Sequence, residues 1–385
     1  MNWLPVRGRS IRQLSTRRRW RNTNSFSSHS LRYSLSQMEQ LVELPHVTRL
    51  SPNVVRVLGQ NPGKFTLQGT NTYLIGQRNP YILVDVGEGR DEYIPALEQA
   101  LTDHATPILP GEVDVSDIIL THRHHDHVNG LPTVLALLNQ RWASRNPDRP
   151  FPPPRIHKIP APETDHHLHP VTSSIAPGHH QPTPEGDAIH DIFDGQKFIV
   201  STAEKSTNPS YVHVIHTPGH TPDSLCLFFP DDRALFTADS VLGHGTAVFE
   251  DLADYMASLQ KLIDFSKDDP ESAEHKYATI YPGHGATIKE GPQHVSTYLR
   301  HRLDRENQIL KVLQSADPVK DWTTWDIVGT IYKRYPQKLW EPAAHSVDLH
   351  LKKLAKEGRV EHLGGEGKEA KWRSSSSEAS HLSSL

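Results

Sequence analysis

Apolar and polar positions form two repeating patterns along most of this chain. Short apolar runs between Gly, Pro and Asn turns are typical of strands buried in a sheet. Apolar residues spaced three and four apart are typical of one face of a helix. We therefore expect strands at 54–58, 72–75, 81–85, 116–120, 197–201, 211–216, 224–229, 234–237 and 279–281, interleaved with helices at 92–103, 131–141, 252–265 and 295–313.

The pattern changes in the last quarter of the chain. Helical spacing recurs at 322–335 and 343–357, and two short strand-like runs follow at 358–361 and 371–373. Helices closed by a small hairpin are the order of a winged helix, a module that often binds nucleic acid. A helical cap packed on the preceding domain is the alternative interpretation.

One stretch lacks either pattern. Residues 147–184 contain eleven prolines and six histidines with few large apolar side chains. We interpret 147–186 as a surface insertion rather than core. Its histidines show no spacing of a metal site, so we expect them to be solvated: His157, His166, His167, His169, His179 and His180.

Charge separates a basic head from an acidic body. Residues 1–40 carry eight arginines, no lysine and one acid, and the rest of the chain has 33 basic and 44 acidic side chains, a net charge of about −11. An Arg- and Ser-rich head that is poor in acids is typical of a mitochondrial presequence, which predicts a mitochondrial location if residues 1–37 are one and a cytoplasmic location otherwise. A disordered tail, or a true start at Met38, is the alternative. The acidic body argues against a large nucleic-acid footprint.

Other counts exclude whole classes of protein. No apolar run has the ~20 residues of a membrane-spanning helix. The single cysteine, Cys226, excludes an internal disulfide and argues against a thiolate-based zinc site. Because Cys226 lies within an apolar strand, we also do not expect it to be a nucleophile.

The candidate chemistry lies directly after predicted strands. The segment Thr121 to His127 reads T-H-R-H-H-D-H, with four ligand-type side chains in six residues. Imidazole and carboxylate ligands without thiolates suit zinc in a catalytic site, with iron or manganese as alternatives. Three later turns add further candidates, and the full set is His122, His124, Asp126, His127, His220, Asp239 and His284.

These motifs resemble the metallo-β-lactamase superfamily. H-x-H-x-D-H, then G-H-T, an aspartate after a strand and G-H-G follow its order over roughly residues 54–288. The resemblance implies an α/β fold, an αββα sandwich, with two zinc ions per monomer. It assigns His122, His124 and His220 to one ion, Asp126, His127 and His284 to the other, and Asp239 to a bridge between them. It also implies that Asp126 orients an attacking hydroxide shared by the ions and carries its proton.

The segments 56–63, 67–73, 241–252 and 349–354 narrow the resemblance to the β-lactamase-like protein 2 branch, although Arg123 replaces a more usual tryptophan. That branch contains a mitochondrial single-strand endoribonuclease and resembles fungal thioesterases that release polyketides from acyl carrier proteins. The metal ligands do not by themselves determine whether the substrate is a thioester or a phosphodiester. The acidic body favours an acyl thioester substrate, such as one on an acyl carrier protein, over single-stranded RNA, which is the alternative. Asn71 is a candidate either to donate a hydrogen bond to the substrate or to cap a turn.

These interpretations divide the chain into four parts. They are a presequence or disordered head at 1–40, a catalytic domain at 41–290 that includes the insertion at 147–186, a winged-helix-like domain at 291–373 and a Ser-rich tail at 374–385.

Overall fold

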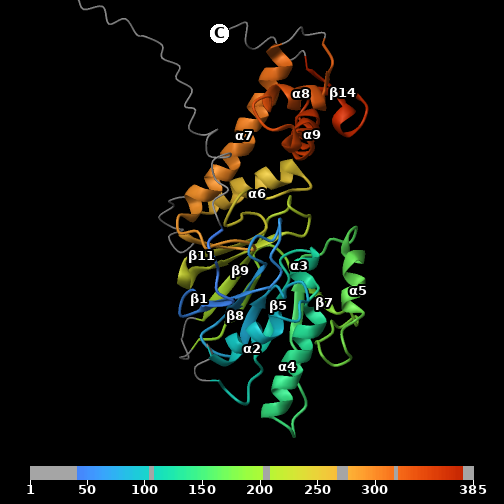
Figure 1. Cartoon of the computed structure of the whole chain (residues 1–385). Helices are drawn as coiled ribbons and strands as arrows, with labels where there is room; N and C mark the ends of the chain where they lie inside the picture. The colour runs from blue at the N-terminus through green and yellow to red at the C-terminus, as the bar shows by residue number, and fades with distance from the viewer. Residues whose placement is uncertain (1–40, 104–107, 203–208, 267–275, 316–319, 376–385) are drawn as a thin grey trace, which may run out of the picture. The chain divides into compact units, whose positions relative to one another are not determined.

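The computed structural model describes residues 41–103, 108–202, 209–266, 276–315 and 320–375. The predicted head at 1–40 and most of the Ser-rich tail therefore lie outside the described residues. Two sheets pack face to face between residues 47 and 282, and a smaller sheet follows them in the chain (Figure 1).

The larger sheet has seven strands in sequential order. They are β1 (Val47–Arg49), β2 (Val54–Leu58), β3 (Asn71–Ile75), β4 (Tyr81–Val84), β5 (Val115–Ile119), β6 (Arg155–Lys158) and β7 (Ile189–Asp191). Strands β1 to β4 are antiparallel, and β4 to β7 run parallel to one another. The parallel strands place their carboxyl ends at one edge of the sheet, which is where ligands bind in α/β folds.

The second sheet has the order β12-β11-β10-β9-β8. Its members are β8 (Lys197–Val200), β9 (Ser210–His216), β10 (Leu225–Phe229), β11 (Ala234–Ala238) and β12 (Thr279–Pro282). Every residue of the central strand β10 is buried, which explains its unbroken apolar sequence, L-C-L-F-F.

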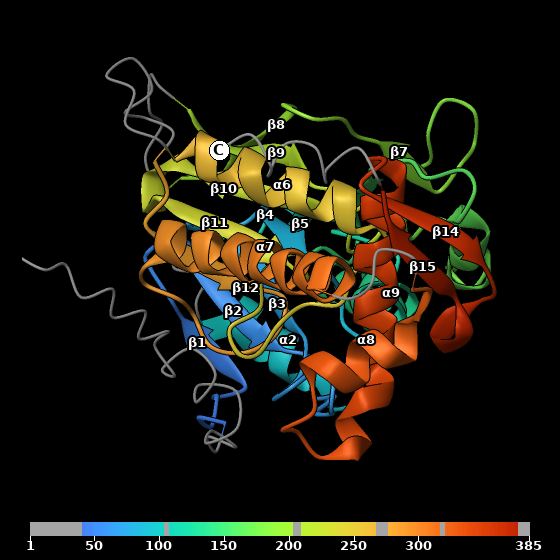
Figure 2. The same ribbon diagram turned by 90° about the horizontal axis from the view of Figure 1, so that it is seen from above.

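The two sheets and the helices that cover their outer faces form four layers, and three apolar cores hold these layers together. One core joins the larger sheet to α2 (Tyr93–Asp103) and α4 (Leu131–Arg145). A second fills the space between the two sheets, with Tyr73, Phe229 and Phe236 among its members. The third lies beneath α6 (Leu252–Phe265) and α7 (Gly291–Ser315), which lie side by side over the second sheet (Figure 2). The predicted αββα sandwich is confirmed.

The C-terminal region has its own core and its own sheet. Helices α8 (Thr324–Ile331) and α9 (Trp340–Lys356) pack with the end of α7, and β13 (Trp322–Thr323), β15 (Lys371–Ser374) and β14 (Val360–Gly364) form a three-stranded wing. Thr323 and Asp326 cap α8 reciprocally, which fixes where this helix begins. The winged-helix interpretation is confirmed.

The interpretation of 147–186 as a purely surface insertion is wrong. Residues 155–158 form β6 inside the larger sheet, and Ile156, His157 and Lys158 are buried. The His157 imidazole lies 2.8 Å from a carboxylate oxygen of Asp117 on β5, so this histidine is not solvated. Three prolines directly before Arg155 conceal the strand, because proline is rare inside sheets.

No helix in the described part of the chain is both long enough and apolar enough to cross a membrane.

Candidate metal centre

All seven predicted ligand side chains meet at one edge of the sandwich. The loop after β5 and the short helix α3 (His125–Val128) supply four of them, and the turns after β9, β11 and β12 supply the others. The larger sheet therefore contributes His122, His124, Asp126 and His127, whereas the second sheet contributes His220, Asp239 and His284.

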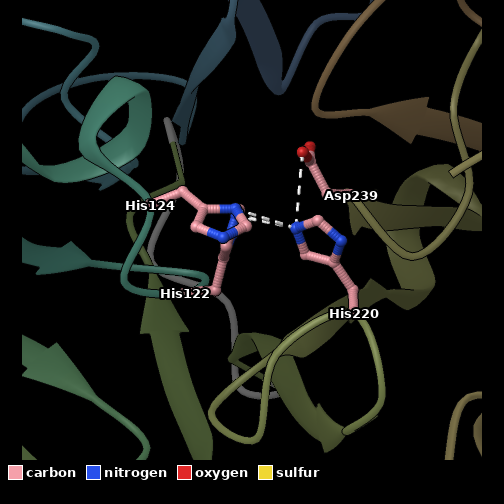
Figure 3. Close-up of side chains that lie close together, drawn as sticks. All are labelled: His122, His124, His220 and Asp239. Carbon is pink, nitrogen blue, oxygen red and sulfur yellow. Dashed lines mark hydrogen bonds and ion pairs between the residues drawn. The ribbon is translucent and has the colours of Figure 1, made fainter. Parts of the chain in front are cut away.

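The first group consists of three imidazoles and one carboxylate that point toward one another (Figure 3). The His122 Nε2 atom lies 3.0 Å from His124 Nδ1 and 3.2 Å from His220 Nε2. The His220 Nε2 atom lies 3.0 Å from His124 Nδ1 and 3.6 Å from an oxygen of Asp239. Three ring nitrogens converge on one point, as the ligands of one ion do.

The second group lies beside the first. Asp126 Oδ2 lies 3.3 Å from both His127 Nε2 and His284 Nε2. Asp239 connects the groups, because its carboxylate also lies 3.4 Å from His127 Nε2 and 3.3 Å from His284 Nε2. This position between the two groups is compatible with the bridging role predicted for Asp239.

Hydrogen bonds behind the centre fix the orientation of its side chains. The His127 Nδ1 atom lies 2.7 Å from Asp85, which also accepts hydrogen bonds from the backbone and hydroxyl of Thr121. The His220 Nδ1–H donates to the carbonyl of Val248 at 2.8 Å, which leaves Nε2 as the inward lone pair. Thr70 donates to Asp126 at 2.9 Å.

The protonation states differ between the two groups. Burial lowers the pKa of His122 well below its usual value and lowers that of His124 to about 4, so both rings are neutral at pH 7. Burial opposes the charge of His284 as well, but the Asp239 carboxylate outweighs it and raises the pKa of His284 to about 9. Burial alone would raise the pKa of Asp126, yet the adjacent His127 lowers it well below the usual range, so Asp126 is a carboxylate.

The donor set fits divalent metal ions. His127 Nε2 and an oxygen of Asp239 are buried without a hydrogen-bond partner, and both point into the centre. Buried polar atoms seldom remain unpaired in folded proteins, and a cation would satisfy both. Carboxylates and deprotonated imidazoles are the donor types of zinc sites, so His284 would release its proton when an ion binds.

Other residues singled out in the sequence have structural roles. The Asn71 side-chain amide donates to the carbonyls of Pro282 and Gly285, and Tyr73 donates to Pro282 as well. Asn71 therefore fixes the turn that carries His284, and the N–H groups of its side chain are already used. Cys226 is fully buried, and burial raises the pKa of its thiol to about 11, which agrees with the prediction that it is no nucleophile.

Sequence motifs did not reveal the supporting residues. Asp85 follows β4 in a left-handed conformation with a φ of 58°, which is rare for aspartate and common near functional sites. Its position at the end of the predicted strand 81–85, two residues before Gly87, was the available signal. Thr70 and the Val248 carbonyl have no signal of their own, since their roles depend on contacts distant in sequence.

A four-layer sandwich with a His/Asp centre at its edge defines a metallo-hydrolase class, and this chain belongs to the metallo-beta-lactamase superfamily. The pattern of that superfamily matches residues 65–284. The beta-lactamase associated winged helix domain matches residues 323–372. Members of this fold bind divalent metals, and the predicted family is confirmed.

Curated relatives cover most of the chain. The "Beta-lactamase-like protein 2 homolog" of Drosophila melanogaster is 37% identical over 82% of this chain and 92% of its own length. The "Atrochrysone carboxyl ACP thioesterase" of Claviceps purpurea is 34% identical over 78% of each chain. The "Lactamase-like protein vrtG" of Penicillium aethiopicum is 32% identical over 88% of this chain and 93% of its own.

Solved structures share the fold at low sequence identity. A beta-lactamase domain protein from Burkholderia ambifaria superposes with a TM-score of 0.60 at 16% identity, covering 87% of this chain and 96% of its own. A metallo-beta-lactamase family protein from Thermus thermophilus gives a TM-score of 0.54 at 18% identity, covering 85% and 100%.

Proposed function

We propose that this chain is a dinuclear zinc hydrolase that cleaves acyl thioesters carried by an acyl carrier protein. The observation that carries the proposal is the joint presence of seven converging ligand side chains and extensive similarity to proteins named as acyl-carrier-protein thioesterases. Those relatives are 32% to 34% identical over 74% to 85% of this chain.

Different side chains would make different contributions to hydrolysis. Zinc ions held by the two groups would polarise the thioester carbonyl and acidify an attacking water. Asp126 would orient that water through its carboxylate and accept its proton. Thr70 holds the Asp126 carboxylate in place through its hydroxyl.

A ribonuclease needs cationic groups for the phosphates of its substrate. Three lysines of α9 are candidates for such contacts, but each one is already paired with an acid. Lys352 pairs with Asp348, and Lys356 pairs with Asp251. Lys353 pairs with Glu306 and Glu357. These pairs favour the thioesterase over the endoribonuclease alternative.

The test measures metal and both activities on one preparation. Elemental analysis should find about two zinc per chain. The zinc-loaded protein should release free thiol from an acyl-pantetheine thioester, and its catalytic efficiency should change little between low and physiological salt. A single-stranded RNA substrate is assayed in parallel, because RNA binding would weaken with a log–log salt slope of about −0.7 for each phosphate contact.

Three results would overturn the proposal. Activity without any bound metal would remove its chemical basis. Thioester turnover that is absent from zinc-loaded protein would remove its substrate class. Cleavage of RNA with steep salt dependence, lost on truncation after Gln314, would favour the endoribonuclease instead.

The mitochondrial location is a separate proposal, supported by the eight arginines of residues 1–40. Residues 1–37 fused to a fluorescent protein should direct it to mitochondria, and the chain that starts at Met38 should not enter them. Equal catalytic efficiency of the two forms is expected, because every ligand lies after residue 120.

A further inference from the structure

Arg123 lies between two ligands of the first group, and its side chain points into a cluster of buried charges. The guanidinium donates to Glu250 at 2.5 Å and lies 3.5 Å from Asp223, and only 12% of its side chain is exposed. Asp223 in turn comes three residues after the ligand His220. One side chain thus connects the loop of His122 and His124 to the loop of His220.

Asp223 depends on two cations for compensation of its charge. Its carboxylate is fully buried, and neither oxygen has a hydrogen-bond partner of ordinary geometry. Lys158, which is also buried, lies 3.1 Å from one carboxylate oxygen, and Arg123 lies near the other. A buried carboxylate without such compensation is costly, so the two cations and Asp223 hold one another in place.

The cluster extends to the Pro-rich segment and to the turn before α6. The Lys158 ammonium also donates to Asp165 at 2.6 Å, within residues 147–186. Glu250 is fixed from the other side, because its backbone N–H donates to the carbonyl of Gly219, beside His220. The loops that carry the first group are therefore joined through side chains that touch no ligand atom.

The second group is supported by residues outside this cluster. Asp85 holds His127, Thr70 holds Asp126, and Asn71 holds the turn of His284. None of these contacts involves Arg123, Asp223 or Lys158. Asp85 also reaches the first group through the Thr121 hydroxyl, which lies 3.1 Å from His122 Nδ1, so it is the Arg123 cluster that supports one group alone.

We infer that Arg123 is a positioning residue for the first metal group, and that it acts through Asp223 and Glu250 to hold His122, His124 and His220 at ligand spacing. The inference rests on the metal-binding half of the proposed function and is independent of the substrate. Residues that orient metal ligands change metal affinity by about 10- to 100-fold when replaced.

The test measures zinc affinity by competition with a chromophoric chelator in variants that retain one group each. In a His284→Ala background only the first group is complete, and Arg123→Met should weaken zinc binding there by about 10- to 100-fold. In a His122→Ala background only the second group is complete, and the same substitution should leave zinc affinity unchanged. Arg123→Lys should give an intermediate loss, because one ammonium cannot span both Asp223 and Glu250 as the guanidinium does.

Matched variants separate positioning from loss of fold. Arg373→Met removes an arginine that pairs with Asp321 in the wing, and should change neither affinity. If Arg123→Met does not fold, Glu250→Gln, whose side chain is 46% exposed, should weaken the first group in the same direction. Circular dichroism on each variant identifies those that fold.

Two results would overturn the inference and leave the proposed function intact. One is an unchanged zinc affinity of the first group in folded Arg123→Met, and the other is an equal loss of zinc affinity in both backgrounds. If the unsubstituted chain binds no zinc, the proposed function itself fails, so the two failures are distinguishable.

Discussion

At the scale of single residues, Asp126 is the side chain on which the proposed chemistry depends most. It accepts a hydrogen bond from Thr70 and lies 3.3 Å from two imidazole nitrogens of the second group. Asp126→Asn keeps the shape but removes the proton acceptor, so kcat/KM for thioester hydrolysis should fall by at least ~100-fold. Zinc content is measured alongside activity, and wild-type turnover in this variant would place the proton acceptor elsewhere.

His350 predicts a pH dependence of stability. This α9 residue is fully buried, its Nδ1–H donates to Ser346, and burial lowers its pKa to about 4. Between pH 4 and pH 6.5 the unfolded chain binds a proton at His350 that the folded chain does not, so stability falls as the pH drops through this window. A shift of this size corresponds to about 3 kcal/mol.

Chemical unfolding at several pH values checks this prediction. Between pH 6.5 and pH 4, His350→Leu should lose less stability than the unsubstituted chain. His345→Gln, at an exposed position of the same helix, should retain the original pH dependence. Equal slopes for His350→Leu and the unsubstituted chain would show that the folded and unfolded chains bind a proton at His350 alike.

At the scale of elements, the start of α6 and the loop of His220 are packed without space between them. A Cβ on Gly219 would lie 2.2 Å from the backbone nitrogen of Tyr255, and Gly219 has a φ of +126°. Gly219→Ala should therefore cost roughly 2–6 kcal/mol of stability, from backbone strain and overpacking together. Urea unfolding checks this value, and zinc content shows whether His220 moves with its neighbour.

A second glycine separates these two causes. Gly195 has a φ of +83° with open space around its Cβ position, so Gly195→Ala should show the strain without the clash. A cost for Gly219→Ala no larger than that of Gly195→Ala would mean that α6 shifts to accommodate the methyl group.

The elements that the sequence predicted are those with a strong local pattern. The apolar runs at 54–58 and 224–229 became β2 and β10, whose residues are all or nearly all buried. The strands β1, β6 and β7 were missed, because each has only three or four residues and two of them adjoin proline-rich segments. A strand this short is specified by its neighbours in the sheet rather than by its own sequence.

The candidate site likewise contains residues that the sequence predicted and residues that it did not. The seven converging side chains lie in short motifs after strands, so their type and spacing were visible in the sequence. The carboxylates of Asp85 and Asp223 were not predicted, since their partners lie 36 or more residues away along the chain. Long-range pairing of this kind depends on the packing of the two sheets.

At the scale of the whole molecule, helix α7 and the turn before α6 connect the catalytic sandwich to the winged helix. Lys356 of α9 pairs with Asp251, the N-cap of α6, and the Phe249 and His350 rings pack with centroids 6.5 Å apart. Phe249 lies one residue before Glu250, the partner of Arg123. The winged helix thus contacts the segment that supports the first metal group.

The metal centre also joins the two sheets, because each sheet supplies part of both groups. Each ion that binds the folded chain and not the unfolded one stabilises it by about 4 kcal/mol at a thousandfold excess over Kd, so two ions contribute about 8 kcal/mol. A domain of this size shifts its Tm by about 2–4 °C per kcal/mol, so complete removal of both ions by a chelator should lower the Tm by roughly 16–32 °C. Zinc added back should restore the Tm, whereas a variant with both His122→Ala and His284→Ala should respond to neither treatment. If the Tm does not change in protein that elemental analysis shows to be metal-free, the packing of the two sheets does not depend on the ions.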